Sequence, residues 1–157
     1  LTTKQRLDGI EKLVETTKKE GGKILCGGKK PANFNKGYYF EPTIFDEVKD
    51  NFTIMKEEPF GPIVPILTFK SFEEVIERAN NNDLGLCSYI YTNDLRKATK
   101  ASELMETGCV AVNTAAVAVA EAPFGGIKQT GYGREGGSMA IKDYLNIKYT
   151  HFGISYE

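Results

Sequence analysis

The chain has 157 residues, of which 20 are basic and 21 acidic, for a formal net charge of −1. Its length suits about one domain, and its 41% hydrophobic content excludes intrinsic disorder and fibrous repeats. The balanced charge argues against a nucleic-acid partner, because phosphate-backbone binding needs a basic face. No stretch approaches the ~18 apolar residues of a membrane helix. No signal peptide is visible, and three scattered cysteines fit a reducing compartment, so we expect a cytoplasmic protein.

The first part of the chain predicts one helix followed by extended segments. Thr2 and Gln5 have the spacing of a capping box, and Gly21-Gly22 marks the helix end. Between them, apolar positions recur every three or four residues: Leu7, Ile10, Leu13, Val14 and Thr17. Residues 23–26 predict a short strand, and residues 38–48 predict extended chain around Pro42.

From residue 63 onward, strands and helices alternate. Residues 63–69, 86–91 and 109–113 are apolar and predict strands. Residues 71–80, with Phe72, Val75, Ile76 and Ala79 on one face, and residues 93–107, with Leu95, Ala98, Ser102 and Met105, predict helices. Ser71 and Glu74 form a capping box before the first of them. This order predicts an α/β fold, a mainly parallel sheet with helices on both faces, because short strand–helix–strand connections are right-handed and the strands lack polar alternation.

The last part of the chain changes character. Residues 122–137 are dense in glycine and predict a loop, and residues 138–144 a short helix. Residues 145–152 alternate well enough for a strand with one exposed face. We therefore divide the chain into residues 1–144 and a terminal strand and tail, residues 145–157.

A glycine motif near the end matches a dinucleotide-binding pattern letter by letter. The run is Gly131-Tyr132-Gly133-Arg134-Glu135-Gly136. The fingerprint needs a preceding strand that points a helix N-terminus at the pyrophosphate, and residues 127–130 do not predict one. A loop whose glycines adopt positive φ is the simpler interpretation.

The remaining titratable residues offer little chemistry on their own. His151, the single histidine, has no G-x-S-x-G serine to partner it. One histidine and three isolated cysteines, Cys26, Cys87 and Cys109, do not form a metal-ligand cluster, so we expect no metal. Each cysteine is best explained as a small buried hydrophobe in or beside a strand.

The segment Glu57-Glu58-Pro59-Phe60-Gly61-Pro62 is more informative. Proline disfavours helical backbone in the residue before it, so Glu58 is held extended before a stiff turn. A carboxylate and an aromatic ring fixed two residues apart suit a sugar diol and a flat ring. A solvent-facing Glu58 on a braced turn, with Phe60 in the core, explains the same residues without a ligand.

Several short motifs follow one another in a single register over nearly the whole chain. They are Glu57 to Pro62, Ala79-Asn80-Asn81, Leu84-Gly85-Leu86, Val112-Asn113, Pro123-Phe124-Gly125-Gly126-Ile127-Lys128 and Gly131-Tyr132-Gly133-Arg134-Glu135. Together they resemble the aldehyde dehydrogenase superfamily. The closing Gly-Arg-Glu-Gly, with Asp143-Tyr144-Leu145 and Ile147-Lys148-Tyr149, is most similar to the succinate-semialdehyde dehydrogenase branch.

The resemblance implies an enzyme that oxidises an aldehyde to the acid with NAD or NADP. In that family a cysteine thiolate forms a thiohemiacetal, hydride passes to the cofactor, and a glutamate-activated water hydrolyses the thioester. The nucleophile, the general base, the oxyanion-site asparagine and the Rossmann-like domain lie upstream of the matched region, and none of the three cysteines here falls at the nucleophile's place. The resemblance therefore implies a C-terminal fragment, inactive alone, and the start at Leu1 rather than Met agrees.

A few positions carry over by resemblance. Glu58 matches the glutamate that binds the nicotinamide ribose, Phe60 the aromatic residue beside the nicotinamide, and Phe124 a residue that shapes the aldehyde pocket. Residues 115–121 match the substrate-entry loop, where Ala118 and Val119 replace the serine typical of succinate-semialdehyde enzymes. Another semialdehyde or an aliphatic aldehyde thus stays open as substrate.

The resemblance also implies homo-oligomers, dimers or tetramers, in which residues 145–152 join a neighbouring subunit. Two other functions stay open. The chain could be a non-catalytic α/β interaction module whose last strand pairs with a partner's sheet. It could also bind a dinucleotide alone through residues 131–136.

Overall fold

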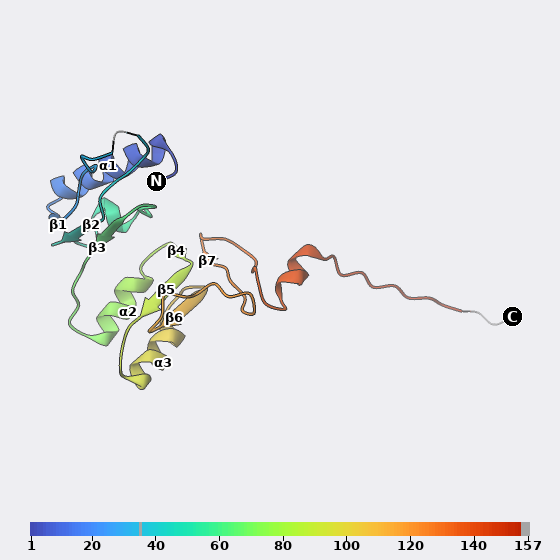
Figure 1. Ribbon diagram of the computed structural model, residues 1–157. Coiled ribbons are helices and arrows are strands. Elements are labelled where there is room, and N and C mark those ends of the chain that lie inside the picture. Colours follow the sequence, from blue (N-terminus) through green and yellow to red (C-terminus); the bar gives the residue numbers. More distant parts are fainter. Residues whose placement is uncertain (35, 155–157) are drawn as a thin grey trace. The chain divides into compact units, whose positions relative to one another are not determined.

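The computed structural model describes residues 1–34 and 36–154. The chain divides into two compact units, Leu1–Val75 and Ile76–Glu157, and the boundary falls inside helix α2 (Phe72–Asn80) (Figure 1). Each unit has its own strands.

The first unit begins with helix α1 (Lys4–Lys19), followed by strands β1 (Lys23–Cys26), β2 (Thr43–Asp46) and β3 (Ile63–Pro65), with the short helix η1 (Thr53–Met55) between the last two. The opening helix and the strand after it are confirmed. The cap is one residue later than expected, since the Thr3 hydroxyl accepts the Arg6 N–H at 3.1 Å.

The three strands form one sheet in the order β1-β2-β3. Strands β1 and β2 are antiparallel, with a bulge between Ile24 and Cys26, and β2 and β3 are parallel. Strand β3 ends at Pro65, and the Ile66 N–H just beyond it still donates to the Phe45 carbonyl of β2 at 2.8 Å.

The main hydrophobic core lies in this first unit. All five residues predicted for the apolar face of α1 are buried. They pack with residues of β2, β3, η1 and the connections between them, and Phe45 on β2 is 0% exposed. The core therefore fixes how α1 lies on the sheet.

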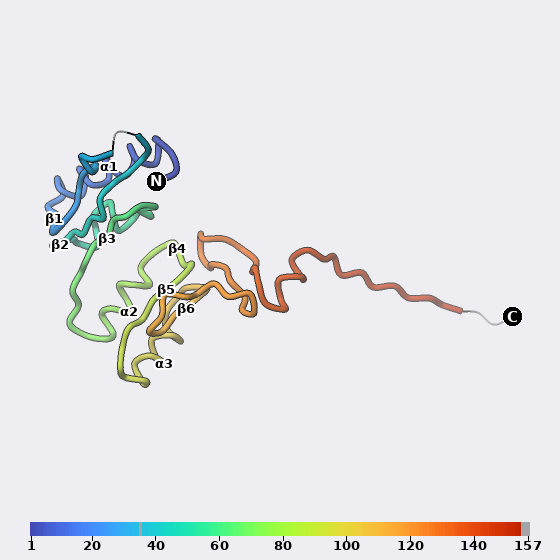
Figure 2. The backbone as a smooth tube through the Cα atoms, in the orientation of Figure 1, coloured from blue at the N-terminus to red at the C-terminus, as the bar shows by residue number. Residues whose placement is uncertain are grey.

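The second unit contains strands β4 (Leu84–Gly85) and β5 (Cys87–Ile90), helix α3 (Leu95–Leu104), strands β6 (Cys109–Val112) and β7 (Ile127–Lys128), and the short helix η2 (Ala140–Tyr144). Strands β5 and β6 are parallel neighbours (Figure 2), and β4 pairs antiparallel with β7. The predicted strand–helix–strand unit β5-α3-β6 is confirmed, whereas β7 lies where only a loop was expected.

The expectation of one mainly parallel sheet covered on both faces is not met by the described residues. They form three small sheets, and two of the four strand pairings are antiparallel. Strand β3 pairs with β2 inside the first unit, and β5 pairs with β6 inside the second. The α/β class itself holds.

Two helix faces are also less buried than predicted. Helix α2 has no buried residue. Helix α3 buries Ala98 and Ala101, but Leu95 in its first turn is 79% exposed. Small alanines allow α3 to approach β5 and β6 closely, and Leu95 lies outside that contact.

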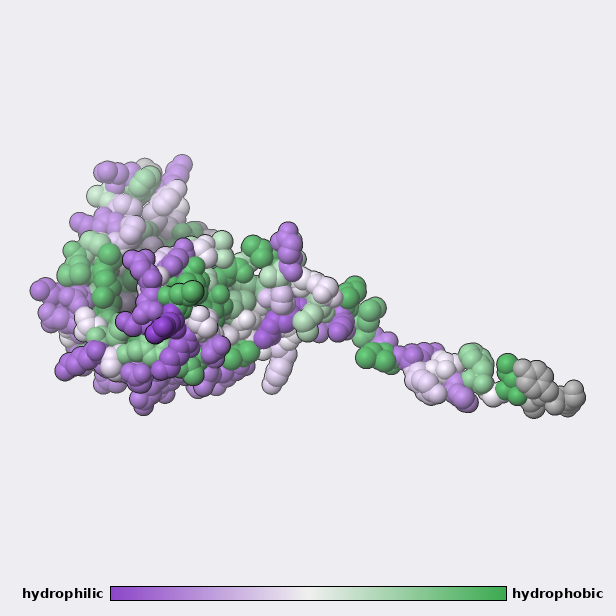
Figure 3. Space-filling model, turned by 90° about the horizontal axis from the view of Figure 1, so that it is seen from below, coloured by the Kyte–Doolittle hydropathy of each residue, from purple (hydrophilic) through white to green (hydrophobic). Residues whose placement is uncertain are grey.

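No strand is present over residues 145–154, where the structure shows an extended, exposed segment. A strand needs a hydrogen-bonded neighbour, and the described part of the chain offers this segment none. Hydrophobic residues recur along it in Figure 3, and Ile147 is 102% exposed. Its expected role in assembly therefore stays a prediction.

Candidate functional site

The turn from Glu57 to Pro62 follows η1 and leads directly into β3. The Phe60 N–H donates to the Glu58 carbonyl at 2.9 Å, and the Pro62 carbonyl accepts the Thr43 N–H at 2.8 Å, which ties the turn to β2. Gly61 packs against α1, since a Cβ there would lie 2.6 Å from Ile10 Cδ1. A larger residue at this position would therefore require the Ile10 side chain to move.

The turn and the start of α1 enclose a cavity of about 400 Å³. Glu57, Glu58 and Phe60 line it from the turn, and Thr3, Gln5, Arg6 and Gly9 line it from the helix. Glu58 is exposed, and the Phe60 ring is 66% exposed instead of buried in the core. The two residues singled out in the sequence therefore share one accessible cavity.

Sequence reasoning missed Arg6, which also faces this cavity. Its guanidinium lies over the Phe60 ring, 5.4 Å from the centroid, in a cation–π contact. Arg6 is on the polar face of α1, more than fifty residues before Phe60 in the chain. No pattern in the sequence pairs the two, because only the packing of α1 against the turn brings them together.

Phe124 belongs to the second unit, where it lines a hollow of about 350 Å³ with the glycine-rich segment. An isolated antiparallel bridge joins it to Glu135. Arg134 closes the segment further, since its guanidinium donates to the carbonyls of Gly126 at 2.9 Å and Gly133 at 2.7 Å. The backbone of Phe124 is therefore tied to the glycine-rich segment by the bridge to Glu135.

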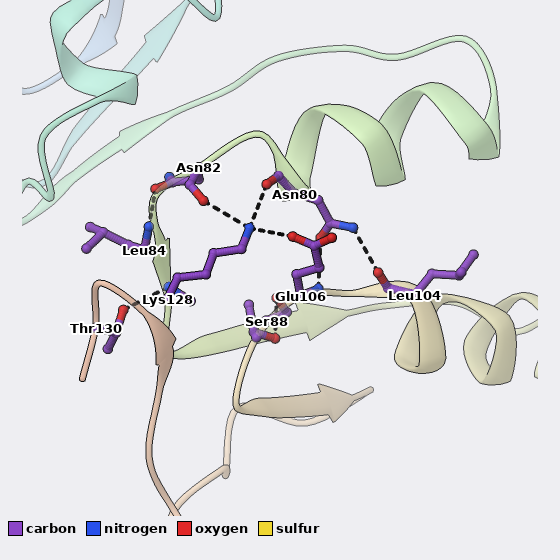
Figure 4. Close-up of polar contacts among 10 residues, drawn as sticks. Asn80, Asn82, Leu84, Ser88, Leu104, Glu106, Lys128 and Thr130 are labelled. Carbon is purple, nitrogen blue, oxygen red and sulfur yellow. Dashed lines mark hydrogen bonds and ion pairs between the residues drawn. The ribbon is translucent and has the colours of Figure 1, made fainter. Parts of the chain in front are cut away.

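Lys128 anchors the other end of the Phe124 segment (Figure 4). Its ammonium donates to the carbonyls of Asn80 at 2.8 Å and Asn82 at 3.0 Å, and it pairs with the Glu106 carboxylate at 2.6 Å. The Asn80 amide in turn donates to the Leu104 carbonyl at 2.8 Å. These contacts tie β7 to the ends of α2 and α3.

A comparison with protein families places this chain. The model of the aldehyde dehydrogenase family matches residues 1–150. The chain belongs to the aldehyde dehydrogenase family. It is 48% identical over 144 residues to human retinaldehyde dehydrogenase 3, covering 92% of this chain and 28% of that protein. It is 43% identical over 155 residues to a chloroplastic betaine aldehyde dehydrogenase of Beta vulgaris, covering 99% and 31%.

Solved structures agree with this placement. The NAD+ complex of an aldehyde dehydrogenase from Bacillus cereus superposes with a TM-score of 0.90 at 41% identity, covering 94% of this chain and 30% of that one. The chain thus spans about 30% of the length of the aldehyde dehydrogenases that it matches. These similarities establish the family. They do not favour the succinate-semialdehyde branch that the closing motifs suggested.

The glycine motif of this aldehyde dehydrogenase chain does not have the dinucleotide-binding context. Residues 131–136 follow the two-residue strand β7 and lead to η2, not to an α-helix. Gly131, Gly133 and Gly136 have positive φ, as the simpler interpretation predicted.

The other sequence candidates stay outside the cavities described above. His151 stands in the exposed tail, where its ring lies near Tyr149. All three cysteines are free thiols, and Cys26 is exposed instead of buried. Among the described residues, no group of three or more His, Cys, Asp or Glu could hold a metal, and no helix is both long and apolar enough to cross a membrane.

Proposed function

We propose that this chain is the C-terminal part of an NAD(P)-dependent aldehyde dehydrogenase whose nucleophile lies in polypeptide before Leu1. The observation that carries the proposal is the cavity in which Glu58 and Phe60 meet. Family membership over residues 1–150 supports the reaction class.

The residues around this cavity fit the sugar and ring of a nicotinamide nucleotide. The exposed Glu58 carboxylate can accept hydrogen bonds from a ribose diol, and the exposed Phe60 ring can pack on a flat ring. Glu57, Glu58 and Arg6 give the lining a net charge of −1, which suits a cationic nicotinamide. When bound, the cofactor supplies a hydride acceptor, while these residues orient it.

We propose a semialdehyde as the substrate, with succinate semialdehyde first, because the closing motifs around residues 133–149 resemble that branch. Phe124 would shape the pocket. The relatives above are named for retinaldehyde and betaine aldehyde, so a panel of these three aldehydes with the full-length enzyme tests the choice. A higher kcat/KM for either of the other two would contradict it.

The role of Glu58 is tested by Glu58→Gln in the full-length enzyme. Loss of the carboxylate removes a charged hydrogen bond, so we expect roughly a tenfold lower rate of cofactor reduction or a similar loss in cofactor affinity. Glu57→Gln, on the same turn and lining the same cavity, is the matched control and is expected to change both much less. Equal effects of the two changes would contradict a specific hydrogen bond from the cofactor to Glu58 and would leave only its negative charge as the cause.

The fragment proposal has its own test. The isolated chain is expected to show no aldehyde oxidation, and the full-length protein is expected to show it. Turnover by the isolated chain would contradict the proposed position of the nucleophile.

Assembly is proposed on the same resemblance. Residues 145–152 would add as a strand to a neighbouring subunit, giving a dimer or tetramer of the full-length protein. Their unpaired, exposed state in this chain supports the proposal, because an extended segment with alternating apolar residues is suited to strand addition.

A further inference from the structure

Two cysteines of the second unit are direct neighbours on adjacent strands. Cys87 on β5 is in register with Cys109 on β6. Paired residues of parallel strands send their side chains to the same face of the sheet, and neighbouring strands lie about 4.8 Å apart. That spacing falls within the roughly 4.4–6.8 Å between Cα atoms that a disulfide bridges.

The surroundings of the pair leave both sulfurs available to each other. Both residues are free thiols and half-buried. Burial raises the pKa of the Cys87 thiol, and the charge of Cys109 and a hydrogen bond with it raise that pKa further. The coupling agrees with the register in bringing the two thiols together.

We propose that Cys87 and Cys109 form an oxidisable dithiol, which closes to an intramolecular disulfide under a two-electron oxidant such as hydrogen peroxide. The proposal depends on the β5–β6 register and is independent of the proposed enzyme activity.

The chemistry balances with the peroxide as the only co-reactant. One sulfur, as thiolate, attacks a peroxide oxygen, so that an S–O bond forms, the O–O bond breaks and hydroxide leaves. The second sulfur attacks the sulfenic sulfur, so that the S–S bond forms and the S–O bond breaks. Two thiol protons and two electrons pass to the peroxide, which becomes two waters.

Formation of the disulfide would also change a contact with the segment that carries Phe124. The Cys109 thiol lies 3.9 Å from the Gly125 carbonyl oxygen, to which it donates. Because a disulfide sulfur has no proton to donate, disulfide formation removes this hydrogen bond to Gly125, the residue after Phe124. An effect on the aldehyde pocket rests on the proposed function, whereas the disulfide itself does not.

The test treats the folded 157-residue chain with a modest excess of hydrogen peroxide, blocks the remaining thiols with N-ethylmaleimide and maps the peptides by mass spectrometry. We expect one linkage, between Cys87 and Cys109, with Cys26 unlinked. Cys26 is the internal control, because it is exposed and in register with Ile44 instead of a cysteine. The same treatment in urea should give all three possible pairings.

Variants separate the register from general reactivity. Cys26→Ser is expected to keep the linkage in full, and Cys87→Ser or Cys109→Ser to abolish it and leave the remaining thiol open to maleimide. Circular dichroism of each variant checks that it is folded. If Cys87 and Cys109 both stay free in the folded chain while Cys26 is oxidised, or if the linkage pattern equals that in urea, the proposal is overturned.

Discussion

Single side chains join segments that lie far apart in the sequence, and Glu20 shows how. Its carboxylate follows the end of α1 and accepts the Thr53 N–H at 3.1 Å and the Thr53 hydroxyl at 2.7 Å. One residue thereby fixes the start of η1, and with it the entry to the turn that carries Glu58.

We expect Glu20→Ala to lower the free energy of unfolding of the chain by about 2 kcal/mol, because hydrogen bonds to a charged group are lost and a half-buried N–H loses its acceptor. Denaturant unfolding measures it. Glu15→Ala is the control, because its ion pair with Lys18 is exposed and should matter by less than about 0.5 kcal/mol. Equal losses would contradict the role assigned to Glu20.

Cys87 gives a prediction in pH. Burial, with the charge and hydrogen bond of Cys109, holds the pKa of this thiol above its ordinary value of 9.0. The folded state therefore binds the thiol proton more tightly than the unfolded state does. The tighter binding of this proton adds to the free energy of unfolding. The added stability is complete below pH 9.0 and is lost as the pH rises through the pKa of Cys87 in the folded state.

Alkylation by iodoacetamide checks this pKa, because only the thiolate reacts. At pH 8, Cys87 should react more slowly in the folded chain than in the urea-unfolded chain, and the gap should narrow above pH 9. Cys109→Ala removes both the charge and the hydrogen bond of Cys109 and should speed the alkylation of Cys87. A folded rate equal to the unfolded rate at pH 8 would show that the pKa is not raised.

At the scale of elements, substitution of alanine for glycine is expected to have opposite effects on stability at two positions. A Cβ at Gly9, inside α1, meets nothing within 4 Å, whereas a Cβ at Gly108, just before β6, would lie 1.8 Å from the Gly125 carbonyl oxygen. The first position has room for a side chain, and the second is a close approach of two backbone segments.

We expect Gly9→Ala to raise the free energy of unfolding by about 1 kcal/mol, because alanine favours the helix interior over glycine. Gly108→Ala should lower it by about 2 kcal/mol or more, since backbone must shift to admit the methyl group. Thermal unfolding of the two variants beside the parent chain checks both signs. An unchanged free energy of unfolding in Gly108→Ala would contradict the close approach of the backbone at Gly108 and Gly125.

The elements also show why periodicity predicted some features and missed others. The stripe from Leu7 to Thr17 predicted α1 and its buried face, since each residue recurs on one side of a regular helix. Strand β7 was missed because two residues, Ile127 and Lys128, carry no period. It exists through its pairing with β4 and through the contacts of Lys128.

At the scale of the whole chain, the two units differ in how much they bury. The first has the large apolar core around Phe45, whereas the buried hydrophobic residues in the described part of the second are the alanines Ala98, Ala101 and Ala111. Large apolar side chains such as Tyr89 and Leu95 are exposed there. The second unit thus leaves more of its large apolar side chains exposed than the first.

Deletion of residues 145–157 tests the proposed role of the tail. Because residues 145–154 are exposed throughout, the isolated chain should keep its free energy of unfolding within about 0.5 kcal/mol. In the full-length protein the same deletion should shift the assembly to smaller species in analytical ultracentrifugation. An unchanged sedimentation profile of the full-length protein would remove the tail from the assembly interface.

The sequence alone determined the α/β class and most element positions, because periodicity and capping act between neighbours in the chain. Motifs in one register carried the family resemblance, and that resemblance singled out Glu58 and Phe60. Tertiary structure decided the sheet pairings, the cavity shared by Glu58 and Phe60, the contact of Arg6 with Phe60, and the register of Cys87 with Cys109. These depend on residues far apart in sequence, which are brought together only when α1 packs on the turn and when β5 and β6 align. No local pattern records such distances.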